Sequence, residues 1–415
     1  MNEEKGVELA RSARAAALAL MANGLGRRRA FFEELARLLC EAREDLMEAN
    51  RRDLSAAAKQ GLSPAMTDRL SLQGGRLEEL ARSVLAIADQ PDPLGVSEGR
   101  VLASGIRLSK VRVGIGVVGF IFESRPGVVV DAACLCVKSG NAVMLKGGKE
   151  AAHSNLALES LIRAALLKSG LPVDLVVLLD STDRASVGHL IRQPGLVDVV
   201  IPRGGKGLIK RVMEESRVPV IKHYEGNCHQ YVHSDADLAM ALEVVDNSKT
   251  QRPGVCNALE SLLVHREIAG EFLPQLAARL IGKGVEIRAC PESLPFMAGA
   301  VVAVEDDYGA EYLELILSVK VVGDLEEAIS HINHFGSGHT DGILTRSLHS
   351  ARAFSDGVDS AVVMINASTR FNDGGRFGLG AEIGISTDKL HARGPMGADS
   401  LTTYKYIACG DGQIL

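Results

Sequence analysis

The hydrophobic pattern divides the chain into a helical first part and a region of strands. Apolar residues recur every three or four positions over residues 7–60 and again over Leu77–Ala88, which predicts amphipathic helices. From Val101 the pattern changes to alternation. Val101–Leu108 and Lys110–Val118 alternate or run apolar, with Gly105 as a turn signal, and we expect a strand pair there.

Short apolar strands then alternate with helical segments. The predicted strands are Ala142–Leu145, Leu175–Leu179, Val197–Ile201 and Val218–Ile221, and the predicted helices are His153–Ser169, Asp183–Arg192 and Gly207–Glu215. This repeat requires a parallel sheet with right-handed crossovers. It predicts a doubly wound, nucleotide-type domain whose ligands bind at the carboxyl ends of the strands.

A second alternation predicts another α/β domain. Its strands are Ala258–Val264 and Ala300–Val304, and its helices are Leu238–Ser248, Ile268–Leu280 and Leu325–Ile332. Thr402–Cys409 is a last strand without a nearby partner. We expect this strand to complete a sheet elsewhere, for which a sheet of another subunit is one option.

The composition narrows the class of function. The 415-residue chain is 46% hydrophobic and 24% charged, which is typical of a globular protein of two or three domains. Its net charge of −6 argues against a nucleic-acid-binding surface, because phosphate binding needs surplus Lys and Arg. It contains no Trp and only 4% aromatic residues, which disfavours base-stacking platforms and aromatic carbohydrate clefts.

Cysteine and histidine patterns bear on the compartment and on metals. The seven cysteines form no CxxC pair, so we expect reduced thiols in a cytoplasmic protein. The longest apolar run, around Val117–Phe122, is too short to cross a bilayer, and we expect no signal peptide. His331, His334 and His339 lack an accompanying carboxylate motif, so we expect loop hydrogen bonds there and no metal site.

Gly114, Gly116 and Gly119 match the GxGxxG pattern of dinucleotide-binding loops. That motif needs a helix opening at its third glycine and an acid about 20 residues further on. Here strand-like residues continue to Phe122, and Ser139 stands near the acid's place. We interpret these glycines as part of a closely packed strand.

Two other glycine loops follow predicted strands, at Lys146–Lys149 and at Pro202–Lys206. Glycines at the start of a helix expose N–H groups and the positive end of the helix dipole, and both favour phosphate. Each loop alone is also typical of an ordinary βα turn. Because both contain Lys or Arg and belong to one sheet edge, together they predict a phosphate-bearing ligand.

Cys256 has unusual surroundings among the cysteines. A polar, glycine-containing loop with Lys249 and Arg252 precedes it, and an apolar strand follows. Nearby cations lower the pKa of a thiol and so increase the fraction of nucleophilic thiolate. Cys256 is therefore the candidate nucleophile, whereas the other six are explained as buried apolar residues or surface thiols.

Several longer motifs identify a family. They are Phe122–Pro126 (FESRP), Ile201–Gly205 (IPRGG), Gln251–Cys256 (QRPGVC), Val322–Ile343 (VGDLEEAISHINHFGSGHTDGI) and Arg376–Gly380 (RFGLG). With these motifs in order, the chain resembles the aldehyde dehydrogenase superfamily over nearly its whole length. The Val322–Ile343 block is similar to the signature of the branch that acts on glutamyl phosphate.

The resemblance implies an aldehyde dehydrogenase-like α/β fold with three parts. A Rossmann-type domain of residues 1–98 and 117–223 would bind NADP(H), and residues 224–395 would form an α/β catalytic domain. A hairpin of residues 99–116 and a strand within 396–415 would form a small β element that joins subunits. We expect a homodimer or a homotetramer.

The resemblance also assigns cofactor contacts. Lys146 matches a Lys that contacts the adenosine ribose, and Lys149 stands where NAD-preferring relatives often carry Glu. A Lys attracts the 2′-phosphate of NADP, which a carboxylate would repel. Glu314 aligns with a Glu that holds the nicotinamide ribose, with a solvated acid as the alternative. The expected cofactor-binding residues are Lys146, Gly147, Lys149, Pro202, Arg203, Gly204, Gly205 and Glu314.

The implied reaction is NADPH-dependent reduction of L-glutamyl 5-phosphate to L-glutamate 5-semialdehyde and phosphate, the second step of proline synthesis from glutamate. Cys256 would displace phosphate and carry a thioester, with Arg125 and Arg252 as candidate partners of the substrate's anionic groups. The alternatives are another acyl-phosphate, acyl-CoA or aldehyde substrate, a non-enzymatic scaffold, and a thiol hydrolase. Contact with glutamate 5-kinase, which makes the acyl phosphate, is plausible but is specified by no residue.

Two positions depart from the family pattern. The Glu that activates water in aldehyde-oxidising relatives falls on His223, with Glu225 as the alternative two residues away. An enzyme that exchanges its acyl group with phosphate needs no such base. The superfamily's side-chain oxyanion donor is also absent, so we expect the Cys256 N–H and a group near Glu123–Ser124 to take its place.

Overall fold

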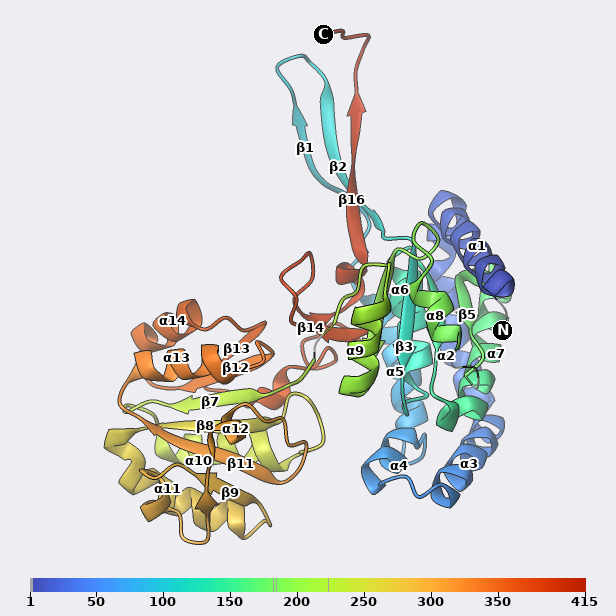
Figure 1. The fold of residues 1–415 in the computed structure, drawn as a ribbon. Coiled ribbons are helices and arrows are strands. Elements are labelled where there is room, and N and C mark those ends of the chain that lie inside the picture. Colours follow the sequence, from blue (N-terminus) through green and yellow to red (C-terminus); the bar gives the residue numbers. More distant parts are fainter. Residues whose placement is uncertain (1–2, 182, 184, 223) are drawn as a thin grey trace. The chain divides into compact units, whose positions relative to one another are not determined.

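The computed structural model describes residues 3–181, 183, 185–222 and 224–415. Contacts within the chain define two compact units. Unit 1 comprises Met1–Lys222, Gly378–Gly384 and Met396–Leu415, and unit 2 comprises His223–Phe377 and Ile385–Pro395 (Figure 1). The short strands β14 (Gly384–Ser386) and β15 (Gly394–Met396) lie where the chain passes from one unit to the other.

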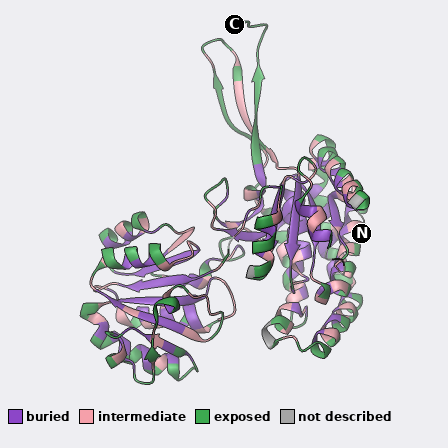
Figure 2. Ribbon diagram, viewed as in Figure 1, coloured by how far each residue is buried: buried purple, intermediate pink, exposed green. Residues whose placement is uncertain are grey.

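Unit 1 is built on a parallel sheet with the strand order β5-β4-β3-β6. Its strands are β3 (Val117–Phe122), β4 (Ala142–Lys146), β5 (Val176–Leu178) and β6 (Val199–Arg203). All residues of β3 and β4 are buried, as Figure 2 shows in purple, which is typical of a parallel sheet covered on both faces. The predicted doubly wound repeat is confirmed.

One predicted strand of this sheet is wrong. Val218–Ile221 forms only an isolated bridge, between Val220 and Val200. Pro219 lies within the segment and has no N–H to extend a ladder, so the pairing stops after one step.

The helices of unit 1 follow the predicted amphipathic segments, with two additions, α4 and α6. They are α1 (Glu3–Ala19), α2 (Arg28–Glu41), α3 (Arg43–Lys59), α4 (Pro64–Leu70), α5 (Arg76–Asp89), α6 (Val128–Lys138), α7 (Ala152–Lys168), α8 (Ala185–Ile191) and α9 (Lys206–Glu215). The sequence pattern does not predict α6, because nine of its residues are buried and a helix that is apolar all round shows no polar face. Among the described residues, no helix of either unit is long and apolar enough to span a membrane.

The GxGxxG glycines lie in and before a strand, as expected. Gly119 is inside β3, and a Cβ there would lie 3.0 Å from the Leu190 side chain and 3.1 Å from that of Val200. No helix opens at this glycine. Close packing therefore explains Gly119, and the GxGxxG match does not form a dinucleotide-binding loop.

A separate antiparallel sheet in unit 1 has the order β1-β2-β16. Its strands are β1 (Gly95–Val101), β2 (Arg107–Gly114) and β16 (Thr402–Cys409). The predicted strand Val101–Leu108 is wrong, because it spans the turn, where Gly105 has a φ of +84°. The last strand has the predicted bounds and completes a sheet far from it in the sequence, by pairing with β2.

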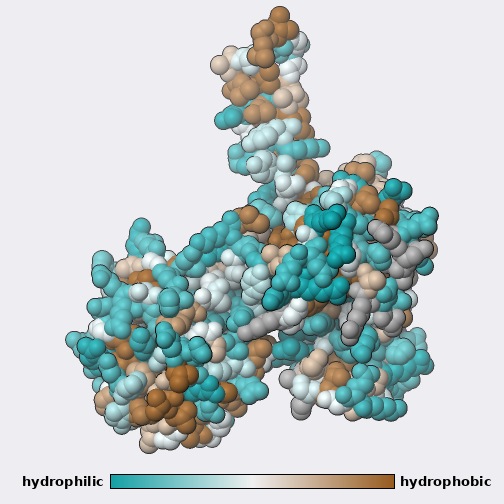
Figure 3. Space-filling model, in the orientation of Figure 1, coloured by the Kyte–Doolittle hydropathy of each residue, from teal (hydrophilic) through white to brown (hydrophobic). Residues whose placement is uncertain are grey.

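This three-stranded sheet carries exposed hydrophobic side chains. Figure 3 shows brown, hydrophobic atoms gathered on it. The exposed apolar residues of its strands are Val96, Val101, Tyr404, Tyr406 and Ile407. Exposed apolar residues on an otherwise polar sheet are typical of a surface that another molecule covers.

Unit 2 contains the predicted second α/β fold, built on a seven-stranded parallel sheet. The strands, in sheet order, are β10 (Val301–Val302), β9 (Glu286–Ala289), β11 (Ile316–Val322), β8 (Leu259–His265), β7 (Cys228–Val232), β12 (Thr340–Leu344) and β13 (Val362–Ile365). The helices are α10 (Leu238–Thr250), α11 (Arg266–Ile281), α12 (Glu305–Tyr308), α13 (Leu325–Phe335) and α14 (Leu348–Gly357). A core around Phe272 and Leu276 fills the space between α11 and the sheet.

Candidate active site

Cys256 lies in the loop between α10 and β8 of unit 2. It is half-buried, whereas the other cysteines fall into two groups: Cys134, Cys136, Cys228 and Cys290 are buried, and Cys40 and Cys409 are exposed. A half-buried thiol in a polar loop can meet a small molecule while the surrounding chain still orients it. The structure therefore distinguishes Cys256 from the other six.

The start of β7 packs directly against the backbone of Cys256. A Cβ on Gly226 would lie 1.9 Å from the Cys256 carbonyl oxygen, so only glycine fits there. The Gly226 N–H donates to Glu311 Oε1 at 2.8 Å, which anchors that glycine. The Cys228 thiol donates to the Cys256 carbonyl at 3.2 Å, and burial keeps the pKa of Cys228 well above its usual value, so the donor stays protonated.

We expect Gly226→Ala to lower the catalytic rate about a hundredfold, because the added methyl must displace the Cys256 backbone and a misplaced nucleophile loses its reactive geometry. Gly254→Ala is the matched control. Its Cβ would lie 3.7 Å from the Leu313 carbonyl oxygen, an ordinary contact. Steady-state rates of both variants, with circular dichroism to verify folding, check this. Equal rates for the two would contradict it.

A buried ion pair flanks the Cys256 loop. Lys249, in the last turn of α10, donates to Glu260 Oε2 of β8 at 2.6 Å, and neither side chain is exposed. Burial raises the pKa of Glu260 to about 7 and lowers the pKa of Lys249. Glu260 Oε1 also accepts the N–H of Leu313, whose φ is +55°. The pair thus ties the Cys loop to the segment before β11, which carries Glu314.

Lys249 was expected only as a cation near the thiol, and Glu260 was not identified. Glu260 is a charged residue in the apolar strand that follows Cys256, but nothing in the spacing shows that it meets Lys249. No role was predicted for Arg370 either, and Arg376 appeared only as the first residue of the Arg376–Gly380 motif. Arg252, one of the predicted substrate partners, lies exposed in the Cys256 loop and is one of the charges that act on Arg370.

The predicted cofactor loops lie in unit 1. β4 and β6 both pair with β3 in parallel, so their carboxyl ends share one edge of the sheet, as expected. Lys146 ends β4 and is buried, and its Nζ donates to the carbonyls of Gly147 and Ser181 at 3.1 and 3.0 Å. Burial lowers the pKa of Lys146. Lys149 is exposed at the start of a 3-10 turn (Lys149–Ala151).

Two carboxylates beside these loops, Glu123 after β3 and Glu150 after Lys149, form hydrogen bonds that were not predicted. Glu123 Oε2 accepts the N–H of Gly205 at 3.0 Å, at the start of α9. Glu150 Oε1 accepts both the N–H and the hydroxyl of Ser124, at 2.6 and 2.9 Å. The hydroxyl hydrogen of Ser124 is therefore already used, which argues against this side chain as the oxyanion donor.

The other predicted positions are distributed over both units. Arg203, at the end of β6, forms a 3.2 Å ion pair with Glu382 of the same unit. Arg125 is half-buried in unit 1, between β3 and α6, whereas Glu314 is exposed in unit 2. Glu225 is partly exposed beside Gly226, and His223 lies outside the described residues.

The three histidines of the long motif lie at and beyond the end of α13. His331 contacts Phe335, with a centroid distance of 4.6 Å, and burial lowers its pKa to about 3. His339 is buried, and its Nδ1 lies 2.8 Å from Thr340 Oγ1. Over the described part of the chain, no three His, Cys, Asp or Glu residues are grouped to hold a metal ion.

Comparison with known proteins extends these observations. The model of the Aldehyde dehydrogenase family matches residues 1–287. A gamma-glutamyl phosphate reductase from Rhodopirellula baltica is 50% identical over 409 residues, which cover 98% of this chain and 94% of that protein. One from Carboxydothermus hydrogenoformans is 52% identical over 382 residues, or 92% of each protein.

Solved structures support the same family assignment. Gamma-glutamyl phosphate reductase from Thermotoga maritima matches with a TM-score of 0.94 at 43% identity, covering 99% of each chain. An acetylating aldehyde dehydrogenase from Geobacillus thermoglucosidasius shares the fold, with a TM-score of 0.73 at 20% identity over 100% of this chain and 98% of that one. The family match and the near-full-length relatives show that this chain belongs to the aldehyde dehydrogenase family, as its motifs indicate.

Proposed function

We propose that this chain is an oxidoreductase that reduces L-glutamyl 5-phosphate to L-glutamate 5-semialdehyde and phosphate with NADPH, the second step of proline synthesis from glutamate. Relatives at 50% and 52% identity that carry the name gamma-glutamyl phosphate reductase support this activity. The observation that carries the chemistry is the half-buried Cys256 thiol, in a loop held from behind by Gly226 and Cys228.

In the proposed mechanism the Cys256 thiolate attacks the acyl carbon of the substrate. A carbon–sulfur bond forms, the bond from that carbon to the phosphate oxygen breaks, and phosphate leaves with the electron pair. The N–H of Cys256 stabilises the negative oxygen of each tetrahedral intermediate. NADPH, when bound, supplies the hydride that reduces the thioester. The resulting thiohemiacetal collapses, and Cys256 leaves as thiolate with release of the aldehyde.

The residues of unit 1 suit a cofactor with phosphate groups. The Gly205 N–H at the start of α9 points at an anionic group, the Glu123 carboxylate, and a cofactor phosphate would have to displace this carboxylate to bind there. Gly147 has no room for a side chain, since a Cβ would lie 2.3 Å from Asn155 Nδ2. We propose that Lys146, Gly147, Lys149, Pro202, Arg203, Gly204 and Gly205 bind the cofactor from unit 1 and that Glu314 binds it from unit 2.

We expect Lys149→Glu to reduce the preference for NADP over NAD at least tenfold, because it replaces an attractive charge by one that repels a 2′-phosphate. The measurement is the ratio of kcat/KM for the two cofactors. Lys59→Glu, the same charge change at an exposed position at the end of α3, is the control. A ratio unchanged in Lys149→Glu would count against this role.

A direct assay tests the function itself. Purified protein, glutamate 5-semialdehyde, phosphate and NADP should give NADPH only when all components are present. Replacing phosphate by coenzyme A, or the semialdehyde by simple aldehydes, separates the alternative substrates. Activity that does not need phosphate would overturn the proposal.

We also propose that the chain forms a homo-oligomer through the β1-β2-β16 sheet. The exposed apolar side chains of this sheet support it, since burying such a surface favours association. Light scattering with Tyr406→Lys and Ile407→Lys together should show a smaller mass than the unmodified protein. An equal mass for both would exclude this sheet as the contact.

A further inference from the structure

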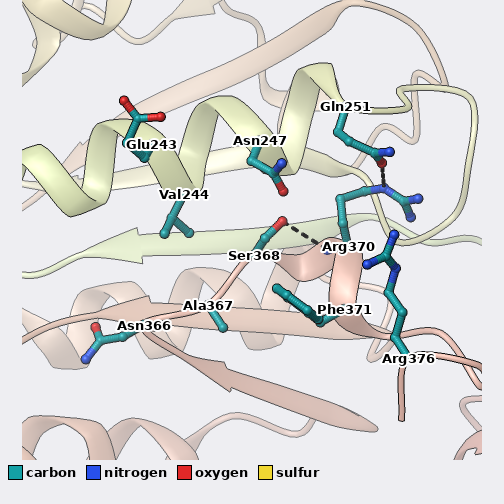
Figure 4. Close-up of a pocket in the computed structure, with 10 residues that line it drawn as sticks. All are labelled: Glu243, Val244, Asn247, Gln251, Asn366, Ala367, Ser368, Arg370, Phe371 and Arg376. Atoms are coloured by element: carbon teal, nitrogen blue, oxygen red, sulfur yellow. Dashed lines mark hydrogen bonds between the residues drawn. The ribbon is translucent and has the colours of Figure 1, made fainter. Parts of the chain in front are cut away.

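A pocket of about 440 Å³ lies within unit 2, and Gln251, which begins the loop that leads to Cys256, is part of its lining (Figure 4). Its walls are the later turns of α10 and the segment 366–376, which includes the 3-10 turn Thr369–Phe371. Gln251, five residues before Cys256, and Arg370 contribute to the same end of the pocket. No residue predicted from the sequence lies in its lining.

Gln251 orients the side chain of Arg370, and the Nη groups of Arg370 remain available as hydrogen-bond donors. Its Nε donates to Gln251 Oε1 at 3.0 Å, drawn as a dashed line in Figure 4. No described residue accepts a hydrogen bond from its two terminal Nη atoms. A guanidinium held through Nε presents those two groups as a planar fork, which matches the two oxygens of a carboxylate.

Other cationic side chains lie near Arg370. Burial lowers the pKa of Arg370, and the charges of Arg252 and Arg376 act in the same direction, whereas Asp373 and the thiol of Cys256 act against it. Arg376 also lines the pocket, and two guanidinium groups in one pocket favour an anionic ligand.

The turn that carries Arg370 is fixed at one end to the Cys256 loop and at the other end to helix α10. Asn257, next to Cys256, donates through Nδ2 to the Asn372 carbonyl at 2.7 Å. The Ser248 hydroxyl of α10 donates to Ser368 Oγ at 3.0 Å and accepts the Thr369 N–H at 3.3 Å. Arg370 is thus held at a set position relative to the nucleophile, as a residue that measures the length of a substrate must be.

We propose that Arg370 binds the α-carboxylate of the glutamyl substrate and selects substrates that carry this group. The inference rests on the function proposed above. Four carbon–carbon bonds separate the α-carboxylate carbon from the acyl carbon that Cys256 attacks, a span of about 5 Å. A cation whose turn is hydrogen-bonded to the Cys256 loop therefore suits the carboxylate, which stays attached throughout the reaction, better than the phosphate, which departs from the reacting carbon itself.

The test is the oxidation of glutamate 5-semialdehyde with phosphate and NADP, which has a separate KM for each component. We expect Arg370→Gln to raise the KM for the semialdehyde tenfold to a hundredfold, because a charge-assisted pair is lost. The KM values for phosphate and NADP should stay within twofold. Arg352→Gln, which changes an exposed Arg on α14, is the control and should leave all three unchanged.

Gln251→Ala provides a second variant that keeps the charge. It removes only the acceptor that orients Arg370, so we expect a several-fold rise in the KM for the semialdehyde alone. It also keeps the proposal testable if Arg370→Gln fails to fold, which circular dichroism would reveal.

The outcomes separate the two proposals. A rise in the KM for phosphate instead of the semialdehyde, or no change in either variant, overturns the role of Arg370 while the function stands. Unmodified protein that does not oxidise the semialdehyde overturns the proposed function itself.

Discussion

Replacing Cys256 by alanine is expected to abolish turnover, with a rate at least a thousandfold below that of the unmodified protein. The reason is chemical: without the sulfur no thioester forms, and the remaining groups only bind the reactants. The assay is phosphate-dependent formation of NADPH from glutamate 5-semialdehyde. Binding of NADPH, followed by its fluorescence, should be retained, because the proposed contacts from unit 1 lie on β4, β6 and the loops after them.

Cys40→Ala is the matched control for this variant. Cys40 is an exposed thiol on α2, so its loss should leave the rate unchanged. Alkylation with iodoacetamide gives an independent readout: activity should disappear as Cys256 is modified, and Cys40 should react without consequence. Retention of activity in Cys256→Ala would contradict the proposed mechanism, and with it the role of the Cys256 loop in positioning a nucleophile.

Lys249→Met is expected to destabilise the protein by about 3–5 kcal/mol, because it leaves the Glu260 carboxyl buried without its cation. A loss of this size should lower the melting temperature of the affected transition by on the order of 10 °C. Differential scanning calorimetry measures it. The double variant Lys249→Met with Glu260→Gln should recover part of the loss, since no charge is then left buried.

The loss in Lys249→Met should also depend on pH. Burial already raises the pKa of Glu260 to about 7, above its usual range, and removing Lys249 removes the main influence that lowers it. A carboxyl whose pKa is higher in the folded than in the unfolded state contributes stability at low pH that is lost as the pH rises through the folded pKa. The variant should therefore be closer to the unmodified protein at pH 6 than at pH 8.5. An equal difference at both values would show that lost packing, not the stranded carboxyl, is the cause.

The fold class was predictable because it depends on local repetition. The alternation of short apolar strands and helices predicted both parallel sheets, and the predicted bounds of β16 agree with the structure to the residue. Elements whose limits depend on a turn or on uniform burial were less accessible. The β1–β2 turn at Gly105 and the fully apolar α6 are examples, because neither produces a distinctive period.

The site shows the same division. The candidate roles of Cys256, of the two glycine loops and of Arg252 were predicted from contiguous motifs. The contacts that position them join residues far apart in the chain: Gly226 against Cys256, Glu123 on Gly205, and Lys249 with Glu260. Each pair looks unremarkable until folding brings its members together.

The sequence by itself determined that this is an α/β protein of the aldehyde dehydrogenase family, with two parallel sheets and one candidate nucleophile, because residue type, period and motif spacing are local properties. Only the tertiary structure decided that Arg370 and Gln251 line one pocket, that the last strand pairs with β2, and that a buried ion pair flanks the Cys loop. These depend on which distant segments meet, and that is settled by the packing of the whole chain rather than by any short stretch of it.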